Sequence, residues 1–164
     1  MEQASSNLVL TLEREIARNV ELVDLCLEGV QEAMSQPGLG QASPEFRHHA
    51  LFSRKAAPKE LGSVLLLDRD GTVVENSVSV QPLRVNMGDR DYFRAHQERS
   101  DVGLFVSRTY SSRVRDGDLS IAVSRRLAAA DRSFAGVIMG SLRLHHKPAQ
   151  DRRNVAGAVS AHPG

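Results

Sequence analysis

Two short segments carry side chains whose types and spacing could perform chemistry. In the first, Arg90 offers a planar fork of hydrogen-bond donors suited to a carboxylate, and Tyr92 offers a ring face and a hydroxyl. The second places Asp68 and Asp70 directly after the apolar run 65–67, and a carboxylate in such a loop is able to act as a nucleophile. A ligand-binding site and a catalytic loop are therefore the alternatives, and the surrounding elements must distinguish them.

Length and composition predict one domain without affinity for polyanions. A chain of 164 residues can form one proper core but is too short for two ordinary domains. Lys and Arg (21) nearly balance Asp and Glu (20), so a net charge of +1 gives no reason to expect nucleic-acid binding. Cys26 is the only cysteine, which excludes an internal disulfide, and we expect no metal site. No signal peptide or membrane-spanning apolar run is present, so we expect a soluble chain.

The N-terminal part of the chain has helical periodicity. Residues 5–36 contain no proline and one glycine, and Pro37-Gly38 follows as a typical helix stop. Apolar residues recur in alternating steps of four and three at Ile16, Val20, Val23, Leu27, Val30 and Met34, with Leu8 and Leu12 extending the stripe. This predicts a helix about 45 Å long. The same spacing is typical of a helix packed across a sheet and of a helix paired with its copy in a homodimer, so both remain open.

The rest of the chain has the shorter periodicity of strands. After a loop and a short helix over 44–54, five apolar runs follow at 64–67, 72–80, 102–107, 119–127 and 134–144. Asp70-Gly71 predicts a hairpin turn, because glycine supplies the positive φ that such turns need. A second short helix is expected within 89–99, with Asp89 as its N-cap. Together these elements predict an α+β fold with a five-stranded antiparallel sheet and a long N-terminal helix packed along it.

The order of these elements resembles the PAS-like fold of the Cache family, the extracytoplasmic sensor modules of bacterial receptors, diguanylate cyclases and histidine kinases. The resemblance covers residues 5–144 and includes the acidic-Gly hairpin, the DRDYF segment, an L-x-V-S strand, the IAVSRR strand and an F-x-G-V strand. It implies a non-enzymatic, cofactor-free domain that binds a small organic ligand and signals through its N-terminal helix. It also implies a location on the extracytoplasmic side of the bacterial inner membrane.

The resemblance also implies where a ligand would bind. Members of the family hold small molecules on one sheet face beneath the DRDYF-like segment, which makes Arg90, Asp91 and Tyr92 ligand candidates. In members that bind amino acids, an Arg-x-Trp-Tyr pattern grips the carboxylate and an Asp on the last strand takes the ammonium. Here the pattern is Arg90 to Phe93, and Ser141 stands near the position of that Asp. The departure disfavours an α-amino acid and leaves another small organic molecule, such as a carboxylate.

Strand 119–127 adds one further candidate. Its clean alternation puts Arg125 on the same sheet face as Ile121 and Val123. Arg125 is therefore expected to be a second anion contact or the ion-pair partner of Asp89 or Asp91, and a structural pair that ties the short helix within 89–99 to the sheet is the preferred interpretation.

Two alternative functions remain. The segment around Asp68 matches the first motif of haloacid dehalogenase-like phosphatases, with Asp68 as nucleophile, and Ser107 and Lys147 could stand in for later motifs. Such enzymes also need a late acidic pair for Mg²⁺ on a parallel sheet, whereas Asp151 is the only acid after Lys147. The other alternative is a PAS-like interaction module without a ligand.

Residues 145–164 lack periodicity and predict a disordered tail.

Overall fold

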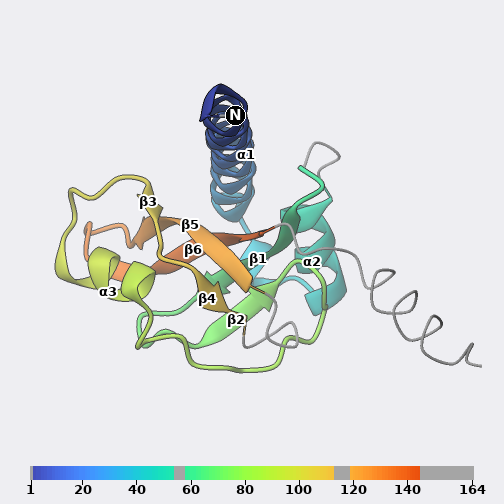
Figure 1. Ribbon diagram of the computed structural model, residues 1–164. Coiled ribbons are helices and arrows are strands. Elements are labelled where there is room, and N and C mark those ends of the chain that lie inside the picture. Colours follow the sequence, from blue (N-terminus) through green and yellow to red (C-terminus); the bar gives the residue numbers. More distant parts are fainter. Residues whose placement is uncertain (1, 54–57, 113–118, 145–164) are drawn as a thin grey trace, which may run out of the picture.

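The computed structural model describes residues 2–53, 58–112 and 119–144, and consists of one antiparallel sheet with helices on both faces (Figure 1). The helices are α1 (Glu2–Met34), α2 (Pro44–Phe52) and α3 (Asp91–Glu98), with a 3-10 turn at Leu39–Gln41. The strands are β1 (Leu61–Leu67), β2 (Val73–Asn76), β3 (Phe105–Val106), β4 (Tyr110–Ser111), β5 (Leu119–Ala128) and β6 (Phe134–Arg143). The predicted tail at 145–164 lies outside the described residues.

The sheet has the strand order β2-β1-β6-β5-β3, and β4 also pairs with β5. Every pairing is antiparallel. Strands β3 and β4 contain two residues each and lie along the same side of β5, so they form one interrupted edge strand. The α+β fold predicted from the sequence is therefore confirmed, and the fifth strand of the sheet is divided in two.

The β1–β2 hairpin explains the DRDGT segment without catalysis. Asp68 Oδ1 accepts hydrogen bonds from the backbone amides of Asp70 and Thr72, each at 3.0 Å, and Gly71 has a φ of 88°. These contacts close the turn between two antiparallel strands, as the hairpin prediction required. The phosphatase alternative needed a parallel sheet, so the observed topology contradicts it. Within the described ranges, no group of three or more His, Cys, Asp or Glu side chains is placed to hold a metal ion.

Helix α1 has two halves with different environments. In the C-terminal half, Val23, Leu27 and Val30 are buried against the sheet, as the apolar stripe predicts. Val23 packs so closely on Gly140 of β6 that a Cβ atom there would lie 2.5 Å from Val23 Cγ1. The N-terminal half projects away from the sheet (Figure 1), and Ile16 in the stripe is exposed. None of the helices in the described parts of the chain is both long and apolar enough to cross a bilayer.

The sheet separates two apolar clusters. The cluster under α1 and α2 contains Val23, Leu27, Val30, Ala33, Leu39, Leu51, Val64, Leu66, Val123, Ile138 and Leu142. The cluster under α3 contains Leu65, Leu67, Val73, Met87, Tyr92, Phe93, Ala122, Val137 and Met139. Successive residues of β1, β5 and β6 alternate between the two clusters because strand side chains point to opposite faces. Each strand residue that faces α3 is therefore followed in sequence by a residue that faces α1.

Candidate functional site

The start of α3 is fixed by Asp91. Asp91 Oδ1 accepts a hydrogen bond from the Tyr92 amide at 2.7 Å, and Oδ2 accepts one from the Arg108 amide at 3.0 Å. The bond with Arg108 ties α3 to the connection between β3 and β4. The expected cap at Asp89 is wrong, because the helix begins two residues later and Arg90 is the N-cap residue. Asp91 therefore holds the backbone that carries Arg90 and Tyr92.

Arg90 has a partly satisfied guanidinium group. Its Nη2 donates to the backbone oxygen of Ser111 at 2.9 Å, and its Cζ lies 4.8 Å from the centre of the Tyr110 ring. Its Nε is buried and has no hydrogen-bond partner among the described residues. A buried donor on a charged group is costly when it stays unpaired, because the lost contact with water is not replaced. Arg90 is thus oriented by its neighbours and retains a donor for an incoming acceptor.

Serine hydroxyls extend this polar region across the sheet. Tyr110 Oη donates to Ser141 Oγ at 3.1 Å, and Ser141 is buried on β6. The neighbouring position on β1 is Ser63, whose buried Oγ has no partner among the described residues. We call Arg90, Tyr110, Ser141 and Ser63 the Arg90 cluster. It combines a positive charge, a ring face and small hydroxyls, which are suited to hold a small polar molecule.

Tyr92 supports this cluster from the core. Its side chain is almost fully buried, and its ring centre lies 6.2 Å from that of Tyr110. Arg90, Tyr92 and Ser141, three of the residues expected from the sequence, therefore lie around Tyr110.

Arg125 does not join this group. It lies on the α1 face of the sheet, where its Nε and Nη2 donate to Asp24 Oδ1 and Oδ2 at 2.6 and 2.9 Å. The carboxylate of Asp24 raises the pKa of Arg125. Asp89 and Asp91 were the wrong partners, and the helix that Arg125 ties to the sheet is α1 rather than the short helix α3. This bidentate ion pair between Arg125 and Asp24 fixes the orientation of α1 relative to β5.

His96 of α3 is a buried titratable group. Its Nε2 lies 3.0 Å from Ser124 Oγ, and its Nδ1 has no partner within the part of the chain that the structure describes. Burial lowers the pKa of His96, a hydrogen bond with Ser124 opposes this, and the charges of Arg126 and Arg125 lower it further. The neutral imidazole is therefore favoured in the folded protein.

This burial predicts that the protein loses stability on mild acidification. An unfolded histidine has a pKa of about 6.5, so below that pH the unfolded chain binds a proton that folded His96 resists. The free energy of unfolding should fall as the pH decreases from about 7.5 to about 5.5. Urea unfolding at both pH values would measure this. His96→Gln should reduce the pH dependence, whereas exposed His49→Gln should not, and equal slopes in all three proteins would contradict the prediction.

Sequence reasoning missed Tyr110 and Ser63. Tyr110 lies in a strand of only two residues, which is too short for an alternation to be recognised. The alternation around β1 was a usable signal for Ser63, because Ser63, Leu65 and Leu67 share one face of that strand.

Comparison with known proteins supports the fold and leaves the activity open. No protein-family model and no curated protein matches the chain. Among solved structures, the extracellular domain of the candidate histidine kinase rpHK1S-Z16 is similar with a TM-score of 0.54 and 22% identity, over 100% of this chain and 62% of that one. The ligand-binding domain of Mlp24 with asparagine has a TM-score of 0.59 and 18% identity, over 88% of this chain and 56% of that one.

A third similar structure is the ligand-binding domain of the Pseudomonas aeruginosa PAO1 chemoreceptor PctC in complex with GABA. Its TM-score is 0.56 at 17% identity, over 87% of this chain and 61% of that one. The chain thus spans between 56% and 62% of the length of these three structures. The chain has the fold of extracellular sensor domains of chemoreceptors and histidine kinases, which confirms the Cache-type, PAS-like fold expected from the sequence.

Proposed function

We propose that this chain is a sensor domain that binds a small organic carboxylate at the Arg90 cluster. The observation that carries the proposal is Arg90, whose guanidinium lies over Tyr110 while its buried Nε has no partner among the described residues. A carboxylate oxygen is the natural acceptor for such a donor, because charge-assisted bonds to guanidinium are short and strong. Ser63 Oγ, which is also buried and unpaired in the described structure, supplies a second polar contact.

The chemistry of the last strand narrows the ligand class. Ser141 is neutral and already accepts a hydrogen bond from Tyr110, so it is poorly suited to balance an ammonium charge. The similar structures of Mlp24 and PctC have asparagine and GABA bound, both of which carry a carboxylate. The carboxylate is therefore the part of those ligands that the Arg90 cluster matches. In this proposal Asp91 contributes by positioning Arg90, and Tyr92 by supporting the Tyr110 ring.

The ligand signal would reach α1 through β6 and β5. Ser141 faces the Arg90 cluster, while the preceding Gly140 faces Val23 of α1 at close range. On β5, Arg125 joins the sheet to Asp24 of the same helix. A ligand that favours one position of β6 would therefore favour one position of α1, provided that it binds the two arrangements with different affinity.

In the cell, this domain would serve as the extracytoplasmic part of a bacterial signalling protein. The similar structures belong to histidine kinases and chemoreceptors, which supports a receptor of that kind. The output in this proposal is a histidine kinase or, alternatively, a diguanylate cyclase, and flanking segments attach the protein to the inner membrane. In this proposal the output is coupled to the ligand through α1, which extends away from the sheet (Figure 1).

Thermal unfolding of the full chain against a library of carboxylates, amines and amino acids would test the proposal. A ligand present at about 100 times its Kd adds about 2.7 kcal/mol to the free energy of unfolding. We expect a saturable rise of the unfolding midpoint with one class of carboxylates. No shift with any compound would overturn the proposal and leave an interaction module without a ligand as the better description.

The exposed half of α1 leads to a second part of the proposal, a homodimer formed by this helix. Leu8, Leu12 and Ile16 continue the apolar stripe, yet they are 61%, 46% and 44% exposed. Further along, the stripe is covered by the sheet. A stripe with this spacing pairs well with its own copy, because both helices then bury matching side chains.

Leu8→Gln combined with Leu12→Gln should therefore shift the protein from dimer to monomer. Sedimentation velocity over a range of concentrations would measure the change. Leu25→Gln is the matched control, since Leu25 is equally apolar and exposed on the same helix but lies outside the stripe. A wild-type protein that stays monomeric at the highest concentration would refute the homodimer.

A further inference from the structure

A second polar region lies at the opposite end of β5 from the candidate carboxylate site. It is a cavity of about 410 Å³ lined by Gln31 of α1, Ser100 and Gly103 between α3 and β3, Arg125 and Arg126 of β5, and Arg132 of the β5–β6 turn. The cavity exists because β3 pairs with β5 only at Val123 and Ser124. The outer edge of β5 beyond Ser124 has no strand beside it among the described residues.

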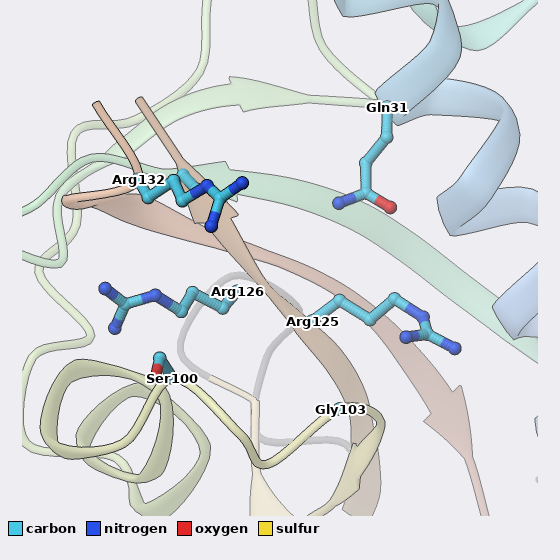
Figure 2. Close-up of a pocket in the computed structure, with 7 residues that line it drawn as sticks. Gln31, Ser100, Gly103, Arg125, Arg126 and Arg132 are labelled. Carbon is cyan, nitrogen blue, oxygen red and sulfur yellow. The ribbon is translucent and has the colours of Figure 1, made fainter. Parts of the chain in front are cut away.

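Arg126 is held in position at this cavity. Its Nη1 donates to the backbone oxygen of His96 at 2.6 Å, and its Cζ lies 5.1 Å from the centre of the Phe134 ring. Figure 2 shows that Arg125 and Arg126 leave β5 in opposite directions, as neighbours on a strand must. Arg125 points toward its partner Asp24. Arg126 is therefore the arginine of β5 that is available to bind a ligand in the cavity.

Arg132 occupies an unusual backbone conformation. The turn is closed by hydrogen bonds from the Arg132 amide to Ala129 O and from the Ala129 amide to Ser133 O, each at 2.9 Å. Arg132 has a φ of 68°, a left-handed conformation that glycine or asparagine adopts more easily in such turns. A turn of this kind does not require an arginine. Glycine could therefore replace Arg132 without strain in this turn.

The cavity has two guanidinium groups that lie outside any ion pair. The carboxylates of Asp24 and Asp101 pair with Arg125 and Arg99, whereas that of Asp131 accepts from Ser133 and keeps its charge. The charge of Glu28 acts on Arg125. Among the described residues, neither Arg126 nor Arg132 forms an ion pair. Two guanidinium groups on one cavity repel each other unless an anion lies between them.

We propose that this cavity binds a small organic dianion, with a phosphate group or two carboxylates, between Arg126 and Arg132. Guanidinium forks bind such oxygens in pairs, and the hydroxyl of Ser100 and the amide of Gln31 add neutral donors. The cavity volume lies in the range of small-molecule sites. Since Gln31 belongs to α1 and Arg132 to the β5–β6 turn, the bound anion joins α1 to the end of β5, apart from the Arg90 cluster.

Amide chemical shifts of the labelled full chain, recorded during titration with succinate and with inorganic phosphate, would test this site. Acetate serves as the monoanion reference. We expect the amides of Ser100, Gly103 and Arg132 to shift with at least one dianion and to approach saturation at about 10 mM, as for a Kd near 1 mM. Shifts with phosphate alone would indicate a ligand that carries a phosphate group, and shifts with succinate alone would indicate a dicarboxylate.

Arg132→Gly is the decisive variant, because glycine relieves the positive φ and the unfolding midpoint should stay equal or rise. Loss of one charge-assisted contact should weaken dianion binding by about tenfold or more. Arg94→Ala removes the same charge from an exposed position outside the cavity and should leave binding unchanged. Absence of saturable shifts at these amides, or equal binding in Arg132→Gly, would overturn the proposal without affecting the Arg90 cluster, which the amides of Tyr110 and Ser141 report separately.

Discussion

Replacing Gly136 by alanine should destabilise the protein by at least about 3 kcal/mol, a large fraction of the stability of a small domain. Gly136 lies in the central strand β6 with a φ of 144°, which only glycine adopts readily. A Cβ atom at this position would overlap the backbone oxygen of Leu67 in the neighbouring strand β1. The overlap involves backbone on both sides, so a side-chain rotation cannot relieve it. Urea unfolding of the two proteins would measure the difference.

Gly103→Ala is the matched control for this prediction. Gly103 also has a positive φ, 68°, but a Cβ atom there would meet nothing within 4 Å. This change should therefore cost about 1–2 kcal/mol, the conformational part alone. The difference between the two variants reports the contact with Leu67 together with the less accessible φ of 144° at Gly136. Equal losses would mean that β6 shifts away from β1 at little cost, and would refute the close packing described here.

The local elements of this fold were predictable because their signals lie within a few residues. The alternation in β5 correctly gave the face of Arg125, and Asp70-Gly71 correctly indicated the first hairpin. The partner of Arg125 was not predictable, since Asp24 lies 101 residues earlier and any of several acids could have met it. Periodicity fixes which way a side chain points, but the packing of distant elements decides what it contacts.

The candidate site was predictable only where a segment resembles a known pattern. Arg90 and Ser141 were found through such a resemblance, and the structure brings both to Tyr110. Tyr110 and Ser63 join them through strand pairing: the β1 alternation gives the face of Ser63, but only the sheet register places it beside Ser141. A cluster drawn from three strands and a helix start has no sequence spacing of its own. Its chemistry therefore becomes visible only when the sheet register is known.

Arg90→Ala should weaken binding of the carboxylate found by thermal screening by about 100-fold or more, which corresponds to about 3 kcal/mol. The variant removes the only guanidinium that lies over the Tyr110 ring within the described residues. Arg90→Lys keeps the charge but loses the fork, so it should recover only part of the affinity. Isothermal titration calorimetry would measure the Kd of each protein. Arg84→Ala removes an exposed arginine of the nearby loop and should leave the Kd unchanged.

Arg90 also has a structural contact, through its bond to Ser111, so a loss of binding could arise from a displaced strand. Tyr110→Phe separates these explanations, because it keeps the ring beneath Arg90 and removes only the hydroxyl that contacts Ser141. If the ligand binds Arg90 directly, Tyr110→Phe should lose at most about tenfold in affinity, the cost of one neutral hydrogen bond. If the Arg90→Ala and Arg84→Ala proteins bind the ligand with the same Kd, the carboxylate contacts another part of the fold. The assignment of Arg90 as its binding residue would then be wrong.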